Sequence, residues 1–239
     1  MGDNSTPSGS EQLTEEDLRQ AGAFAGLAAD KTQSPIILSF VVDRANLVSL
    51  LGLASGVLAI YFALIQNFPA AIIALLWAVL MDWFDGLVAR RMPGRSEAHK
   101  LVGAHMDSLV DLVTSAIGPA ILLLSVGNLS PWFYPGALAI IMAGVLRLAY
   151  FDAFGVDENN TYAGITMDNS PLVVSGVFLL QGFLNYNVFA AVLYSTVVGL
   201  AFLHVAPFRT GRVGIGWYYV VTAYVVILTA VYSYILWTG

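Results

Sequence analysis

Residues 82–90 read Asp-Trp-Phe-Asp-Gly-Leu-Val-Ala-Arg, and residues 103–111 read Gly-Ala-His-Met-Asp-Ser-Leu-Val-Asp. Asp82 and Asp85 are three residues apart and Asp107 and Asp111 four apart, so each pair shares one face of a helix. Both pairs lie in or at the ends of strongly apolar segments, where a carboxylate is costly and usually functional. If segments 69–91 and 100–126 form an antiparallel hairpin, the pairs face each other. The resulting oxygen cluster suits a pair of hard divalent cations.

The composition predicts an all-α integral membrane protein. Of the 239 residues, 58% are hydrophobic and only 11% are charged, and several segments exceed 18 apolar residues. The net charge is −6 and no basic patch is present, which argues against nucleic acid as a partner.

We expect a bundle of six to seven transmembrane helices with a short N-terminal interfacial helix. Residues 1–34 are predicted to be a flexible acidic tail, and residues 35–45 an amphipathic helix too short to span a membrane. The apolar segments that follow are approximately 46–65, 69–91, 100–126, 133–153, 170–184, 187–205 and 216–238. Whether 170–205 forms one long helix or two spans stays open at this point.

The positions of Lys and Arg predict the orientation. With the N-terminus in the cytoplasm, all ten fall on the cytoplasmic side, and the opposite connections around 66–69, 127–133 and 185–187 contain none. This places the four aspartates near the cytoplasmic face of the cell membrane, within reach of soluble nucleotide and metal.

Two interpretations compete with a catalytic site. In the first, the four aspartates are unrelated polar residues that reach toward the membrane interface. This is disfavoured because even single intramembrane acids are rare. A cation transporter or channel would explain the aspartates, but it would not explain why Gly86, Ala89, Arg90 and Gly103 accompany them.

At these residues the sequence resembles the CDP-alcohol phosphotransferase (CDP-alcohol phosphatidyltransferase) family, whose signature is D-x2-D-G-x2-A-R, a spacer of about eight residues, and G-x3-D-x3-D. Every lettered position is filled, but the spacer, residues 91–102, is twelve residues long. The extra residues, 92–97, are interpreted as an inserted cytoplasmic turn. The resemblance implies a catalytic transmembrane domain over 46–212 and leaves 213–239 as an additional C-terminal helix.

The family resemblance implies metal-dependent transfer of a phosphatidyl or archaetidyl group from CDP-diacylglycerol or CDP-archaeol to an alcohol, with release of CMP. It also implies two Mg²⁺ or Mn²⁺ ions and a homodimer. The metals would be held by Asp82, Asp85 and Asp107, with Asp111 as a further metal ligand. Asp111 would also accept the proton of the attacking hydroxyl. The implied CDP contacts are Asn46, Ser49, Gly86, Ala89, Arg90 and Gly103. For Asn46, capping of the first long helix is an equally good interpretation.

The acceptor follows from a narrower resemblance to the phosphatidylserine synthase branch. Asp107-Ser108-x-x-Asp111 and Gly118-Pro119-Ala120 match its pattern, although its Ser-Phe-Gly portion is not kept. The stretch 146–152 also resembles an element of that branch, and Arg147 is then expected to bind a phosphate or the carboxylate of L-serine, with Ser108 as a further acceptor contact. The alternative interpretation of Arg147 is a charged anchor that reaches the membrane interface. Choline, glycerol phosphate and an inositol phosphate are the alternative acceptors.

Overall fold

The structure, a computed structural model, describes residues 36–155, 161–211 and 214–238. The chain divides into two units, Met1–Ser39 and Phe40–Gly239. The predicted acidic tail lies outside the described residues. Of the predicted interfacial helix 35–45, residues 37–40 form the short 3-10 helix η1 (Ile37–Phe40), and the last two residues, Arg44 and Ala45, already belong to the first long helix. Ile36, Ile37 and Leu38 are exposed.

The expectation of an all-α membrane bundle is confirmed. Among the residues that the structure describes, six helical segments are long and apolar enough to cross a membrane. They are α2 (Arg44–Leu64), α3 (Phe68–Arg90), the run of α4 (Glu97–Asp111), η2 (Leu112–Ile117) and α5 (Gly118–Val126), η3 (Pro131–Phe133) with α6 (Tyr134–Phe154), α8 (Tyr186–Val205) and α9 (Ile215–Thr238).

The segment 170–205 forms two helices rather than one. Its first part is α7 (Asn169–Phe178) continued by the 3-10 turn η4 (Leu179–Gly182), which is shorter than a full span. The chain then turns, and the side chain of Asn185 accepts a hydrogen bond of 3.0 Å from the backbone N–H of Val188 to start α8. A polar N-cap of this kind satisfies a backbone donor that the helix itself leaves unpaired.

The third span changes its helical form directly after Asp111. Residues 112–117 form a π-helix, in which each turn is wider than in an α-helix. Pro119 follows, and a proline has no N–H to bond to the carbonyl four residues earlier and crowds it sterically. The wider turn accommodates this break, and it places the irregular backbone next to the last aspartate of the motif.

Small residues let α2 pack closely on its neighbours. Gly52 lies against Met81 of α3, and a β-carbon at Gly56 would come within 2.6 Å of the Thr114 side chain of η2. Small residues at helix contacts are typical of membrane bundles, where close backbone approach supplies the packing energy. The buried apolar core then extends through α3, α5, α6, α7, α8 and α9.

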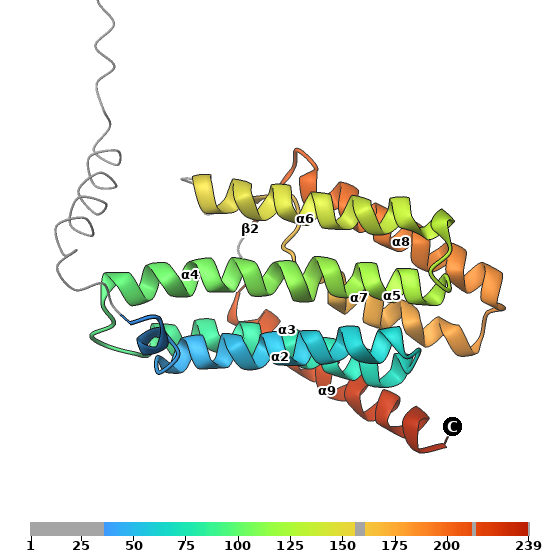
Figure 1. The fold of residues 1–239 in the computed structure, drawn as a ribbon, viewed down its shortest axis with the longest axis horizontal. Helices are drawn as coiled ribbons and strands as arrows, with labels where there is room; N and C mark the ends of the chain where they lie inside the picture. Colours follow the sequence, from blue (N-terminus) through green and yellow to red (C-terminus); the bar gives the residue numbers. More distant parts are fainter. Residues whose placement is uncertain (1–35, 156–160, 212–213, 239) are drawn as a thin grey trace, which may run out of the picture. The chain divides into compact units, whose positions relative to one another are not determined.

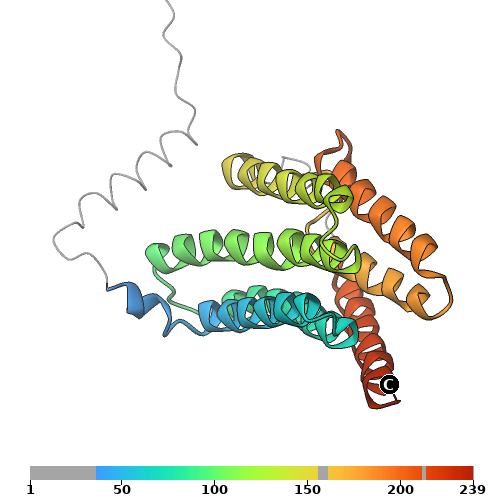
Figure 2. The same cartoon turned by 45° about the vertical axis from the view of Figure 1, so that its right-hand side comes forward.

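The helices connect two ends of the bundle (Figures 1 and 2). The connections 65–67, 127–130 and 183–185 meet at one end, where Gln66 Nε2 donates to Asn128 Oδ1 at 2.8 Å and Tyr186 OH donates to the Val126 carbonyl at 2.8 Å. We call this the opposite end. The other end holds the described Lys and Arg residues except Arg147, which is buried within α6, and we call it the cation-rich end.

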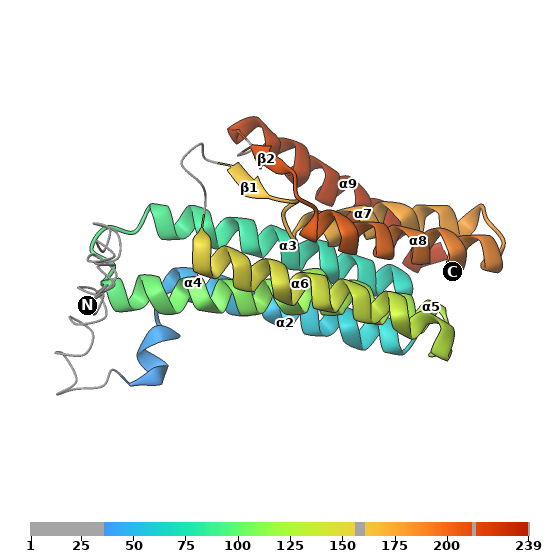
Figure 3. The ribbon, with the colours of Figure 1, turned by 90° about the horizontal axis from the view of Figure 1, so that it is seen from above.

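A two-stranded antiparallel sheet of β1 (Thr161–Ala163) and β2 (Arg209–Gly211) is an addition to the predicted all-helical fold. Thr161 pairs with Gly211 and Ala163 with Arg209. Figure 3 shows the sheet beside the start of α9. The sheet ties the segment before α7 to the segment before α9, so both lie at the cation-rich end.

Candidate functional site

The structure brings three of the four motif aspartates together at the cation-rich end. Ligand oxygens of Asp82, Asp85 and Asp107 all lie within 4.8 Å of one another. Asp85 is buried, with 7% of its surface exposed, whereas Asp82 and Asp107 are half-buried and reachable. Helix α2 packs against both α3 and α4, and so holds these two carboxylate-bearing helices in register.

Asp111 lies one turn further along α4 and is half-buried. It is not among the three aspartates within 4.8 Å of one another, but it interacts electrostatically with Asp107, Asp85 and Arg147. It therefore borders the carboxylate cluster without joining it.

Ser49 of α2 supports the buried carboxylate. Its hydroxyl donates a hydrogen bond to Asp85 Oδ2, which fixes the orientation of that side chain. A partner of this kind typically orients the groups that bind a metal. The structure thus places Ser49, expected at the nucleotide, behind Asp85.

Asn46 takes part in a buried polar network whose centre is Arg95. Arg95 Nε lies 2.7 Å from Asp43 Oδ2, and Arg95 Nη2 donates to Asn46 Oδ1 at 2.7 Å. Asn46 Nδ2 in turn donates to the Phe40 carbonyl at 3.0 Å. The helix cap is Asp43, which accepts from the N–H of Ala45 at 2.9 Å, so the interpretation of Asn46 as the cap is wrong.

Asp43 is the ionised partner in this network. Burial raises the pKa of Asp43, but the hydrogen bond and charge of Arg95, together with the backbone N–H groups of Asn46 and Ala45, outweigh burial and hold it below its ordinary value. Arg95 comes from the extra residues of the motif spacer. Gly103 faces the same network, because a β-carbon there would lie 2.9 Å from Asn46 Oδ1.

A cleft of 630 Å³ opens beside the carboxylate cluster. One wall carries Asp82, Asp85, Gly86 and Arg90 of α3 and Asp107 of α4. The remaining walls come from the segment before α7, from β2 and from the start of α9. They consist of Ile165, Thr166, Asp168, the first α7 residue Asn169, Thr210, Gly211, Trp217 and Tyr218, and Trp83 of α3 completes the lining. Of the predicted CDP contacts, Asn46, Ser49, Ala89 and Gly103 lie outside this lining.

Three side-chain contacts run around the cleft. Arg90 Nη2 lies 3.5 Å from the hydroxyl of Tyr218, whose ring meets that of Trp83 edge-on, with centroids 4.8 Å apart. Trp83 Nε1 donates to Asp168 Oδ2 at 2.9 Å. These contacts join residues separated by 85 to 135 positions, so no local sequence signal marks them.

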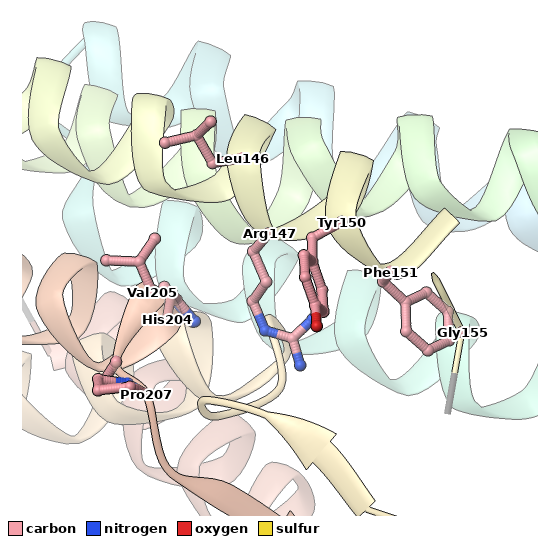
Figure 4. Close-up of a pocket in the computed structure, with 9 residues that line it drawn as sticks. Leu146, Arg147, Tyr150, Phe151, Gly155, His204, Val205 and Pro207 are labelled. Carbon is pink, nitrogen blue, oxygen red and sulfur yellow. The ribbon is translucent and has the colours of Figure 1, made fainter. Parts of the chain in front are cut away.

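The two predicted acceptor residues line two separate cavities, neither of which is the cleft of the carboxylate cluster. Arg147 borders a cavity of 410 Å³ with Tyr150 and His204, and Figure 4 shows its side chain reaching from α6 toward the chain that follows β1. There its Nε donates to the Ile165 carbonyl, at the edge of the cleft. Ser108 lies in a third cavity, where its hydroxyl donates to Asp152 Oδ1 at 2.7 Å.

The donor set fits a hard divalent cation. Three converging carboxylates offer only oxygen atoms, and Mg²⁺ and Mn²⁺ prefer oxygen ligands. Among the residues the structure describes, this is the group of acidic or histidine side chains that meets the geometry of a metal site. The cleft gives a metal-bound ligand room to enter.

Comparison with known proteins identifies relatives with named activities. The chain is 35% identical over 150 residues to an archaetidylserine synthase of Methanothermobacter thermautotrophicus, a match that covers 62% of this chain and 61% of that protein. It is 29% identical over 156 residues to a CDP-diacylglycerol–serine O-phosphatidyltransferase of Bacillus subtilis, covering 64% and 81%. A protein of the same name from Mycobacterium tuberculosis is 36% identical over 111 residues, covering 46% and 37%.

A model of the CDP-alcohol phosphatidyltransferase family matches residues 42–204, which make up more than half of the chain and contain all four motif aspartates. The match ends before β2 and α9, although both contribute to the cleft. The chain belongs to the CDP-alcohol phosphatidyltransferase family.

Proposed function

We propose that this protein transfers a phosphatidyl or archaetidyl group from CDP-diacylglycerol or CDP-archaeol to L-serine and releases CMP. The observation that carries the proposal is the cluster of Asp82, Asp85 and Asp107 at the wall of an open cleft, in a chain of this family. The names of the relatives favour serine over choline, glycerol phosphate or an inositol phosphate as the acceptor. Family membership also argues against a cation channel.

The reaction is a displacement at phosphorus. The serine hydroxyl oxygen bonds to the phosphorus that carries the lipid, the bond from that phosphorus to the CMP oxygen breaks, and CMP leaves. Asp111, next to the cluster and outside it, would accept the hydroxyl proton, because a general base acts best when it is close to the nucleophile.

The Mg²⁺ or Mn²⁺ ions would be held by Asp82, Asp85 and Asp107, with Asp111 as a further ligand. When bound, these cations neutralise the diphosphate of the donor and the charge that develops on it. Ser49 would keep Asp85 oriented, and Gly86 would let the diphosphate approach the backbone. Arg90 at the rim of the cleft would bind a donor phosphate oxygen. Asn46, Ala89 and Gly103 remain predicted nucleotide contacts.

Arg147 and Ser108 remain the predicted acceptor contacts. Through its bond to the Ile165 carbonyl, Arg147 also braces the segment 165–169 that forms one wall of the cleft. A substitution of Arg147 would therefore alter this wall of the cleft whether or not Arg147 itself contacts the acceptor.

We propose that the cation-rich end faces the cytoplasm, since positive residues favour that side of a membrane. The chain contains no Cys, so single cysteines replacing Lys100 and Asn128 give a direct test in sealed cells. A membrane-impermeant maleimide should label position 128 from outside and position 100 only after lysis; the reverse pattern would contradict this orientation. A homodimer, which the family resemblance implies, remains a prediction for light scattering in detergent.

The activity is tested with purified protein, CDP-diacylglycerol or CDP-archaeol, Mg²⁺ or Mn²⁺, and a panel of acceptors. We expect CMP release with L-serine and its loss on addition of EDTA. Release with choline or glycerol 3-phosphate but not with serine would leave the family chemistry intact and refute the acceptor. No release with any alcohol would refute the enzyme.

A further inference from the structure

Asp168 adds to the cleft a carboxylate that belongs to neither half of the family motif. It stands at the start of α7, within electrostatic reach of Asp82, Asp107 and Asp111. Together with Asp82, Asp85 and Asp107, it gives the cleft four carboxylates, while Arg90 is the single Lys or Arg among the lining residues described.

The side chain of Asp168 is held across the cleft instead of capping its own helix. Asp168 occupies the N-cap position of α7, where an aspartate normally bonds to the first backbone N–H groups, yet it makes no such bond. Instead, Asp168 Oδ2 accepts the indole N–H of Trp83, which is its only hydrogen-bond donor among the residues the structure describes. The neighbouring Asn169 closes the turn, with its Nδ2 donating to Thr166 Oγ1 at 2.7 Å.

Aromatic rings surround this part of the cleft. Trp83, Trp217 and Tyr218 all line it, and the Trp83 and Tyr218 rings meet edge-on beside the Asp168 carboxylate. Aromatic faces attract an ammonium group, and a carboxylate pairs with it through charge-assisted hydrogen bonds. Carboxylate and rings together therefore have the chemistry of an ammonium site.

We propose that Asp168 is a specificity-determining residue that binds the ammonium group of the acceptor, an inference that rests on the proposed function. The charges in the cleft support it. The divalent cations would neutralise the negative charge of the other three carboxylates, and the donor phosphate would neutralise the positive charge of Arg90. The remaining negative charge, that of Asp168, would then be neutralised by the ammonium group of the acceptor. The same negative charge disfavours acceptors that carry a phosphate.

The decisive variant is Asp168→Asn, because asparagine keeps an oxygen for the Trp83 N–H but loses the charge. We expect the KM for L-serine to rise about 10- to 100-fold, as for loss of a hydrogen bond between charged groups, while the KM for the CDP-lipid changes less than about threefold. Glu97→Gln is the matched control, since Glu97 lies at the same end, is exposed and pairs only with Lys100 among the described residues. It should leave both constants unchanged.

A serine analogue without the amine, 3-hydroxypropionate, isolates the ammonium group. The wild-type protein should prefer L-serine over this analogue by about 10-fold or more in kcat/KM, and Asp168→Asn should remove most of that preference. Calorimetric titration of L-serine onto protein loaded with Mg²⁺ and CMP measures the same contact without turnover. Should the Asn variant fail to fold, Asp168→Glu keeps the charge and should retain part of the preference.

An unchanged KM and binding constant for serine in a folded Asp168→Asn protein would overturn this inference and leave the proposed function standing. CMP release by the wild-type protein with phosphate-bearing acceptors alone would overturn both.

Discussion

At the cation-rich end, an ion pair and side-chain hydrogen bonds involve charged residues, whereas at the opposite end the uncharged side chains of Gln66, Asn128 and Tyr186 hold the short connections together. The first end contains the carboxylate cluster, the Arg95 network and the cleft. The second contains helix caps and no Lys or Arg among the described residues. Substitutions at the cation-rich end should therefore change chemistry as well as stability, and those at the opposite end stability alone.

The largest expected effect is at the cluster. Asp107→Asn should lower CMP release ~10³-fold or more, because it removes an oxygen ligand from a site that neutralises the diphosphate. Calorimetry with Mn²⁺ should show weaker binding of the cation. Activity within tenfold of wild type would remove Asp107 from the site.

The variant Asp111→Asn tests whether Asp111 acts as the general base rather than as a metal ligand. If Asp111 acts on the acceptor hydroxyl, turnover should fall by a similar factor while binding of the CDP-lipid stays nearly unchanged. Substantial turnover in this variant would show that another group takes the proton.

The next effect concerns Asp43 and Arg95, whose side chains are 4% and 10% exposed. Asp43→Asn keeps the cap but removes the charge, and it should lower the free energy of unfolding by about 2 kcal/mol at pH 7, since Arg95 keeps its bonds to Asn46 and the His99 carbonyl. Thermal unfolding in detergent measures this difference.

The pH dependence of that difference has a definite sign. Because the folded-state pKa of Asp43 is lowered, the stabilisation is complete above the unfolded-state pKa and is lost as the pH falls through the folded-state value. The gap in Tm between wild type and Asp43→Asn should stay constant from pH 7 to about pH 5 and close below it. A gap that widens in acid would contradict the ion pair.

Arg147→Lys should have a moderate effect, about a tenfold rise in the KM for L-serine with little change for the CDP-lipid. Lysine has neither the Nε–H that bonds to the Ile165 carbonyl nor the planar fork that fits a carboxylate. Initial rates at varied serine and fixed donor measure this. A rise in the donor KM instead would move Arg147 to the nucleotide side.

The smallest effect is expected at the opposite end. Asn67 caps α3 by accepting from the N–H of Ala70 at 3.3 Å, so Asn67→Ala should cost about 1 kcal/mol of stability. Its kinetic constants should equal those of wild type well below the Tm. A loss of activity without unfolding would break the distinction between the two ends.

The sequence predicts the parts of this site that follow from helical spacing. Asp82 and Asp85 share one face of α3 because they are three residues apart, and the structure brings Asp107 of α4 against them. Asp111, which helical spacing places on the face of Asp107, borders this cluster without joining it. The approximate limits of the apolar segments also hold, because length and apolarity are sufficient to predict a span.

The remaining parts depend on tertiary contacts that no local pattern encodes. The spacer insertion predicts a turn, but not that its Arg95 reaches back to Asp43 and Asn46. Trp83, Asp168 and Tyr218 meet only when the starts of α7 and α9 lie beside the end of α3. Tryptophan near a helix end is usually interpreted as a membrane-interface residue, so Trp217 gives no sign of the cleft.

The most direct test of the central claim follows the serine atoms themselves. Purified protein is incubated with a CDP-lipid, Mg²⁺ and L-serine labelled with ¹³C and ¹⁵N, and the lipid product and CMP are quantified by mass spectrometry. We expect one labelled serine in each lipid product, one CMP per product, and neither with Asp107→Asn. CMP formed without serine in the lipid, or labelled lipid formed equally by Asp107→Asn, would contradict the account.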